Sequence, residues 1–330
     1  MKKTDIVKKI LLEAHSQPQK EGTGYAPSNI ALCKYWGKKN SELNIPLTSS
    51  LSISLANKGT KTTVSHCEKD QIILNGQQIP ADEQFAIKAF SFLDLFRPQP
   101  EIGYRVLTEV NIPVAAGLAS SACGFAALVL ALNNLYGWEL DKKTLSILAR
   151  LGSGSASRSL WHGFVEWYSG SQIDGLDSYA EPIPTSWPQL RIGLHILESQ
   201  KKSISSREAM KRTVETSILY QSWPKQVQHD LLELKLAIQH NDFDKLGSRA
   251  EQNAMSMHAT MLSSWPPILY SKPETVAAMQ QVWSLREQGI PIYFTQDAGP
   301  NLKLLFLESH REIILNYFPK LEIVNPFQTE

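Results

Sequence analysis

The sequence is poor in several features that assign a protein to a class at once. It has three cysteines, Cys33, Cys67 and Cys123, which are too widely spaced and odd in number to suit a disulfide framework or a zinc site. The 33 basic and 32 acidic residues leave a net charge of +1. This balance gives no reason to expect nucleic acid or an anionic membrane surface as a partner. A reducing, cytoplasmic setting is expected.

Long apolar runs and the two commonest nucleotide-binding fingerprints are also missing. The longest apolar segment, residues 122–135, is too short to span a bilayer. Lysines and a glutamate interrupt the N-terminal segment 1–17, which predicts a short amphipathic helix and not a signal peptide. Neither GxGxxG nor GxxxxGK[ST] occurs. An anionic ligand would therefore have to be held by a local cluster of residues.

The order of the predicted elements indicates an α+β protein. At 330 residues, two domains are the default expectation. Several strands, including 49–56, 60–66 and a hairpin of 71–74 and 77–79 around Asn75-Gly76, precede a helix at 82–96. The second half is mainly helical, with helices expected at about 206–222, 225–240, 242–263 and 274–288. This mixed order argues against a doubly wound parallel sheet. The segment 170–190 is rich in Gly, Ser, Pro and Trp and is the best candidate boundary. We predict domains at 1–190 and 191–330.

The stretch 111–137 changes character in the middle. Its first part carries Gly117, Ser120 and Ser121, and from Ala122 onward apolar residues recur at helical spacing. A glycine-serine loop that leads into a helix N-terminus offers free N–H groups and a favourable dipole to an anion. An ordinary loop before a buried helix is the alternative.

Three further segments combine polar chemistry with predicted strand or loop ends. The strand at 31–33 runs into Lys34, Tyr35, Trp36, Gly37, Lys38 and Lys39, which could line an anion pocket or form a solvated basic turn. A second glycine-serine segment, predicted as a loop at 152–155, is followed by Arg158, whose planar fork suits a carboxylate or phosphate. Asp297 begins the turn 297–301 between two apolar strands, where it is either a turn residue or a functional acid.

Together these segments resemble the GHMP small-molecule kinases and, within them, the mevalonate diphosphate decarboxylases. The family's motifs stand in order along the chain: APxNIAxxKYWGK at 26–38, PTAAGLASSA at 113–122, GSGSACRS at 152–159, an SSRxGM-like segment at 205–210, and DAGPN at 297–301. The departures are Asn40, Val114, Ser157, Trp161, His162 and Ala209. They leave substrate preference slightly open, but not the reaction class.

The resemblance implies a fold, a reaction and partners. The fold would be the two-domain GHMP-kinase fold, with an N-terminal domain like domain 2 of ribosomal protein S5 and a ferredoxin-like C-terminal domain. The reaction would convert mevalonate 5-diphosphate and ATP, with Mg²⁺, into isopentenyl diphosphate, ADP, phosphate and carbon dioxide. Phosphorylation makes a tertiary alcohol a feasible leaving group, and the carboxylate supplies electrons as carbon dioxide leaves. A cytoplasmic homodimer is implied.

The resemblance also implies roles for individual residues. Asp297 would act on the 3-hydroxyl as base or orienter, Arg158 would pair with the substrate carboxylate, and Lys38 would stabilise the transferred phosphoryl group. The substrate-binding set is Asn29, Tyr35, Trp36, Gly37, Lys38, Ser153, Gly154, Ser155, Arg158 and Ser206. The ATP-binding set is Pro113, Ala116, Gly117, Leu118, Ala119, Ser120 and Ser121. No direct protein ligand for the metal is predicted.

Two other readings remain open. The chain could be a related kinase that stops at the phosphorylated alcohol, or a decarboxylase that takes mevalonate or its monophosphate. It could also be a non-catalytic sensor of isoprenoid precursors. Intact Asp297 and Arg158 favour the full reaction over both.

Overall fold

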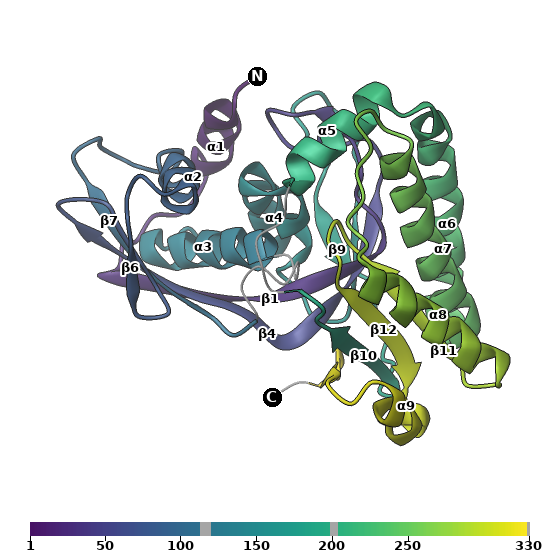
Figure 1. Ribbon diagram of the computed structural model, residues 1–330. Helices are drawn as coiled ribbons and strands as arrows, with labels where there is room; N and C mark the ends of the chain where they lie inside the picture. Colours follow the sequence, from purple (N-terminus) through teal and green to yellow (C-terminus); the bar gives the residue numbers. More distant parts are fainter. Residues whose placement is uncertain (113–119, 199–203, 329–330) are drawn as a thin grey trace.

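The computed structural model describes residues 1–112, 120–198 and 204–328, and they form a mixed α+β structure. The helices and strands are arranged around two main sheets (Figure 1). One sheet belongs to the first part of the chain and the other to the last. The α+β class predicted from the sequence is confirmed.

The first sheet has the strand order β6-β5-β7-β4-β8-β9, with β1 paired to β4. Its strands are β1 (Glu21–Cys33), β4 (Ser50–Cys67), β5 (Gln71–Leu74), β6 (Gln77–Ile79), β7 (Gly103–Val110), β8 (Phe164–Trp167) and β9 (Ala180–Pro182). A small ribbon joins β2 (Lys38–Asn40) to β3 (Ile45–Pro46). The second sheet has the order β11-β12-β10-β13 and consists of β10 (Leu190–His195), β11 (Ile292–Gln296), β12 (Leu302–Leu307) and β13 (Glu322–Val324).

The helices pack against these sheets and against one another. They are α1 (Lys3–Leu11), α2 (Gln84–Leu93), α3 (Ser120–Tyr136), α4 (Lys142–Gly152), α5 (Ser206–Thr216), α6 (Trp223–His240), α7 (Phe243–Leu262), α8 (Pro273–Glu287) and α9 (Arg311–Tyr317). Short 3₁₀ helices are η1 (Gly154–Arg158), η2 (Ile218–Ser222) and η3 (Glu308–His310). Helix α7 contacts both β1 and β11, so it ties the two sheets together.

Strand β1 and helix α3 approach each other closely because β1 has glycine where they meet. A Cβ atom on Gly22 would lie 2.1 Å from the carbonyl oxygen of Ala131, and one on Gly24 would lie 2.5 Å from Cβ of Leu130. The helix follows β1 and β4 along the first sheet (Figure 1). This packing fixes the C-terminal half of α3 against β1.

Three local predictions were wrong. Residues 49–56 and 60–66 were expected as separate strands but belong to the single strand β4, because β1 pairs with both halves across a register shift. The predicted helix 206–222 is divided into α5 and η2 at the extended residue Ser217. The predicted loop 152–155 is instead the end of α4 and the start of η1, joined by extended Ser153.

Candidate active site

Asp297 lies between two lysine ammonium groups. It follows β11, whereas Lys34 follows β1 and Lys303 lies in β12. Lys34 Nζ is 2.8 Å from Asp297 Oδ1, and Lys303 Nζ is 3.1 Å from Oδ2. Burial alone would raise the pKa of Asp297, but the two ammonium groups outweigh it and hold this pKa well below its usual range. The carboxylate is therefore ionised and held through both oxygens.

Residues of helix α7 hold Lys34 and Asp297 in place through hydrogen bonds. Asn253 accepts a hydrogen bond from the backbone N–H of Lys34 (2.8 Å) and donates one to the buried Asp230 (2.8 Å). His258 Nε2 lies 3.2 Å from the carbonyl oxygen of Asp297. Burial, followed by the charge of Lys34, lowers the pKa of His258 to about 4, so this imidazole is neutral at pH 7. Backbone and side chain of the acid are thus both fixed.

Arg158 is buried at the end of η1. Its side chain donates to Ser50 Oγ (2.5 Å) and makes two longer contacts of 3.4 Å with Asn29 Oδ1. Within the part of the chain that the structure describes, no carboxylate forms an ion pair with it. Burial lowers the pKa of Arg158 to about 10, and the negative charge of Asp297 opposes the change. The guanidinium remains charged at neutral pH.

The charges in this region do not balance. Lys34, Lys303 and Arg158 are at most 2% exposed and face the single carboxylate of Asp297. A buried cation is costly unless an anion or hydrogen-bond acceptors compensate it. The site therefore favours an anionic ligand, and a carboxylate or phosphate fits the guanidinium fork.

The turn after Lys34 is fastened to the second half of the chain. The carbonyl oxygen of Trp36 accepts hydrogen bonds from Tyr220 Oη and Trp223 Nε1, each 2.9 Å long. Gly37 has φ +125°, and a Cβ atom there would lie 1.8 Å from Tyr220 Oη. Only glycine fits this turn, which directs Tyr35 toward the site's interior.

Tyr35 packs between the first sheet and η1. Its ring meets Trp167 edge-on at 4.8 Å, and a Cβ atom on Gly154 would lie 2.8 Å from it. Its hydroxyl is buried and has no hydrogen-bond partner among the described residues. A buried hydroxyl without a partner costs free energy, which a bound acceptor would recover.

Lys38 belongs to a second group of cations. Its ammonium donates to Asn44 Oδ1 (2.7 Å), and Asn44 in turn bonds the backbone at the end of α4. Burial, followed by the charges of Arg207 and Lys3, lowers the pKa of Lys38 to about 8. Arg207 follows Ser206 in the first turn of α5. The predicted residues Lys38 and Ser206 thus lie in a basic neighbourhood.

Serines from α3, η1 and the junction of α4 with η1 lie close together at the start of α3. Ser121 Oγ lies 3.5 Å from Ser153 Oγ, which lies 3.3 Å from Ser155 Oγ. A Cβ atom on Gly152 would lie 2.4 Å from the Phe125 ring, so α4 packs directly on α3. Five predicted ATP-binding residues, Pro113, Ala116, Gly117, Leu118 and Ala119, lie outside the described residues, as does any account of the Ser120 side chain.

Lys303 and Arg207 were not predicted as site residues, and Lys34 was considered only within the segment 34–39 as part of an anion pocket or a basic turn. Lys303 did carry a signal, because it is the one charged residue in the apolar strand sequence LKLLFL. Lys34 stood at the end of a buried strand but was grouped with its solvent-accessible neighbours. Lys38, and not Lys34, was expected to act at the reacting centre, whereas the ion-pair partners of Asp297 are Lys34 and Lys303.

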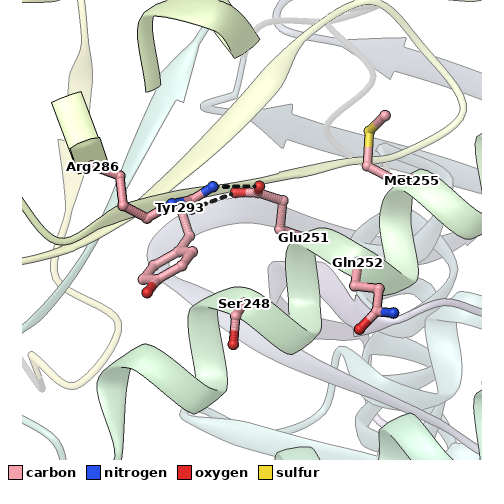
Figure 2. A pocket seen from close by; sticks show the side chains of 6 residues that line it. All are labelled: Ser248, Glu251, Gln252, Met255, Arg286 and Tyr293. Atoms are coloured by element: carbon pink, nitrogen blue, oxygen red, sulfur yellow. Dashed lines mark hydrogen bonds and ion pairs between the residues drawn. The ribbon is translucent and has the colours of Figure 1, made fainter. Parts of the chain in front are cut away.

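A surface depression of about 460 Å³ lies apart from these residues, between α7, α8 and β11. Figure 2 shows Glu251 and Arg286 facing each other across it, with a side-chain separation of 2.9 Å. Glu251 also accepts from Trp283 Nε1 (2.8 Å). The charged side chains that line this depression, Glu251 and Arg286, are therefore paired with each other.

Among the residues that the structure describes, no three or more His, Cys, Asp or Glu side chains converge in a way that could hold a metal ion. None of the helices in these residues is long and apolar enough to cross a membrane.

A mixed fold of two sheets with glycine-serine segments meeting at a helix N-terminus is the GHMP-kinase fold, a class of small-molecule phosphotransferases. Family models agree in detail. The diphosphomevalonate decarboxylase-like N-terminal domain matches residues 26–180, and the mevalonate 5-diphosphate decarboxylase C-terminal domain matches residues 192–327.

Individual relatives lead to the same family. Diphosphomevalonate decarboxylase from Aspergillus fumigatus is 38% identical over 317 residues, covering 88% of this chain and 78% of its own length. A mevalonate diphosphate decarboxylase structure from Enterococcus faecalis has a TM-score of 0.85 and 40% identity, covering 93% of this chain and 97% of that one. A structure described as MDDEF in complex with MVAPP, AMPPCP and magnesium has a TM-score of 0.86, with the same identity and coverage. The chain belongs to the diphosphomevalonate decarboxylase family.

Proposed function

We propose that the chain catalyses the ATP-dependent decarboxylation of mevalonate 5-diphosphate to isopentenyl diphosphate, with ADP, phosphate and carbon dioxide as the other products. The observation that carries this proposal is the unbalanced charge around Asp297, where three buried cations face one carboxylate. A substrate that brings a carboxylate would compensate Arg158. Family membership and the solved complexes with MVAPP and AMPPCP support the same conclusion.

Asp297 orients the 3-hydroxyl of the substrate. The two ammonium groups make the carboxylate a weak base in the resting protein, because they stabilise its ionised form. Phosphoryl transfer has a loose transition state that needs accurate positioning more than a strong base. As the hydroxyl oxygen bonds to the γ-phosphorus and ADP departs, the hydroxyl proton passes to Asp297.

Arg158 holds the substrate carboxylate in line for the second step. Ser50 and Asn29 fix its guanidinium, and its remaining N–H groups can donate hydrogen bonds to a carboxylate. When the bond between C3 and the phosphorylated oxygen breaks, the electrons of the carboxyl–C2 bond form the C2=C3 double bond and carbon dioxide leaves. Correct alignment of the carboxylate is the main contribution of the protein to this step.

The diphosphate of the substrate binds at the other end of the site. Tyr35 supplies a hydroxyl that has no partner among the described residues, and Lys38 supplies an ammonium group close to Arg207. Ser206 stands at the first turn of α5, and Ser153, Gly154 and Ser155 line the junction of α4 and η1. Trp36 and Gly37 act through the turn that places Tyr35.

ATP binds at the N-terminus of α3 through the segment 113–121, where backbone N–H groups and the helix dipole favour phosphate. The hydroxyls of Ser121 and Ser153 lie at this end of α3 and suit phosphate or a hydrated cation. Mg²⁺, held mainly by the nucleotide phosphates and these hydroxyls, would neutralise the developing charge on the phosphoryl group.

Other properties accompany the proposed activity. The chain divides into domains at 1–190 and 191–330, which is supported by family matches that end at 180 and begin at 192. It acts as a homodimer in the cytoplasm, without nucleic acid or membrane partners. Sedimentation of the purified protein at several concentrations tests the dimer, and a monomer throughout would contradict it.

The activity is tested by incubating the purified protein with ATP, Mg²⁺ and, separately, mevalonate, its 5-phosphate and its 5-diphosphate. We expect equal amounts of ADP and carbon dioxide in the incubation with mevalonate 5-diphosphate, and neither product in the other two. ADP without carbon dioxide would show a kinase that stops at the phosphorylated alcohol. Turnover of the monophosphate in preference would correct the substrate, and binding without any ADP would indicate a sensor.

A further inference from the structure

Lys303 is a charged residue in the interior of a buried strand. It lies in β12, whose neighbours β10 and β11 pair with it through Leu194 and Thr295. The lysine is 1% exposed, and five other residues of β12 are all apolar. Burial in an apolar strand would by itself favour leucine or methionine at position 303.

The ammonium of Lys303 has a single polar contact in the described part of the chain. That contact is the 3.1 Å ion pair with Asp297 Oδ2. Lys34, by contrast, also donates to the carbonyl oxygen of Ala31 at 2.8 Å. An apolar side chain would usually serve stability as well as or better than a buried ion pair, so stability does not explain a lysine here.

The two lysines divide the carboxylate between them. Lys34 contacts Oδ1 and Lys303 contacts Oδ2, so neither oxygen can rotate away without losing an ion pair. With Lys34 alone, the carboxylate could turn about its Cβ–Cγ bond, because that torsion is broad. Each oxygen keeps a further lone pair that can accept a hydrogen bond from a substrate hydroxyl.

We propose that Lys303 is a positioning residue for phosphoryl transfer, which fixes the orientation and charge of Asp297 against the substrate hydroxyl. This inference rests on the proposed function. The hydroxyl proton passes to Asp297 as the new oxygen–phosphorus bond forms and the bond to ADP breaks, and Lys303 takes no part in this proton transfer. Among the described residues, the other charged or titratable groups that face Asp297 are Lys34, directly after β1, Arg158 in η1 and His258 in α7.

The test compares Lys303→Met with wild type and with Leu305→Met, a buried residue on the same face of β12. We expect Lys303→Met to lower kcat at least about tenfold, with KM for mevalonate 5-diphosphate within about threefold. The acidic limb of its kcat profile should move to higher pH. Lys303→Arg, which keeps the charge, should recover part of the rate, and Leu305→Met should behave as wild type.

A second measurement needs no turnover. Carboxylate ¹³C NMR titration of the substrate-free protein should show the Asp297 pKa at least about one unit higher in Lys303→Met than in wild type, since an opposite charge has been removed. The pair Asp297→Asn and Asp297→Asn/Lys303→Met should have equal rates, because Lys303 acts through Asp297.

Several outcomes would overturn the inference. The inference is wrong if Lys303→Met has the same kcat and the same Asp297 pKa as wild type. It is also wrong if Asp297→Asn/Lys303→Met is clearly slower than Asp297→Asn. If Lys303→Met does not fold, Lys303→Gln is subjected to the same measurements and the same criteria. If wild type releases no carbon dioxide, the proposed function fails, while the NMR titration still decides whether Lys303 controls Asp297.

Discussion

The ammonium of Lys34 lies 2.8 Å from the carboxylate of Asp297, although the two residues are 263 positions apart. Lys34 follows a strand of the first sheet, and Asp297 follows a strand of the second. The candidate active site is therefore complete only where the two sheets meet. Both residues are held at this junction by α7, through Asn253 and His258.

Replacing Asp297 with asparagine should remove the group that orients the hydroxyl and takes its proton. We expect kcat to fall at least about a hundredfold, with the affinity for substrate retained. Assays of carbon dioxide release and calorimetric titration with mevalonate 5-diphosphate measure the two quantities. Asp174→Asn is the matched control, because Asp174 forms a surface ion pair with Lys9 (3.1 Å). Normal turnover of Asp297→Asn would show that its assigned role is wrong.

Arg158 and Arg150 are both buried arginines, but only Arg158 is placed to meet the substrate. Arg158→Gln should lower kcat sharply and substrate affinity less, because the carboxylate loses its alignment. Its free energy of unfolding should change little, since the buried cation has no carboxylate ion pair among the described residues. Wild-type kinetics in this variant would remove its proposed role.

Arg150→Gln provides the contrast. Arg150 donates to the carbonyl oxygens of Leu43 (3.1 Å), Gly175 (2.6 Å) and Ser178. Its loss should leave buried acceptors unpaired and lower the free energy of unfolding by about 1–3 kcal/mol. Denaturant titration measures this, and the kinetics of the remaining folded protein should stay close to wild type. Both predictions are contradicted if Arg150→Gln mainly lowers kcat and Arg158→Gln mainly lowers the free energy of unfolding.

Substrate affinity should depend on pH through Lys38. Its pKa is lowered to about 8, first by burial and then by Arg207 and Lys3. Above this pH the ammonium loses its proton, so KM for mevalonate 5-diphosphate should rise as the pH increases through about 8. Initial rates between about pH 6 and pH 10 test this. A KM that is constant across that range would contradict it.

The variant Arg207→Gln is a second test of the pH dependence, because it should raise the pKa of Lys38. Removing a neighbouring cation should raise the pKa of Lys38 and move the alkaline limb to higher pH. KM at pH 7 should increase because the basic neighbourhood of the substrate diphosphate loses one positive charge. Arg212→Gln is the control, since Arg212 lies in the same helix and pairs with Glu208 (3.3 Å). An alkaline limb that stays in place in Arg207→Gln would show that Arg207 does not act on Lys38.

The hydroxyl of Tyr35 should matter for binding and little for folding. Because it is buried and unpartnered among the described residues, Tyr35→Phe should leave the free energy of unfolding unchanged or slightly raised, and KM should rise several-fold. Tyr104→Phe should lower the free energy of unfolding and leave KM unchanged, because the Tyr104 hydroxyl lies 2.5 Å from that of Tyr136 within the core. Thermal unfolding and initial rates separate the two. Equal KM values for Tyr35→Phe and wild type would exclude a phosphate contact.

Much of the fold could be predicted because local patterns decide it. Helix α3, hairpin strands β5 and β6, and helices α6 to α8 follow from apolar periodicity and turn residues. The family was likewise recognised from motifs in order, and the comparisons confirm it. The 3₁₀ turn η1 was missed, because a tract of glycine and serine has no periodicity from which to predict one.

The sequence by itself determined which chemical groups were available, namely an acid in DAGPN, an arginine after a glycine-serine segment and lysines after a buried strand. Tertiary structure alone decided which lysines meet the acid. Lys34 reaches Asp297 because β1 of the first sheet and β11 of the second both pack against α7. Lys303 reaches it from β12, the strand that pairs with β11. Ion pairing acts over a few ångströms in space and is independent of separation along the chain. No local pattern could have distinguished Lys34 from Lys38, whereas burial and the position of the second sheet do.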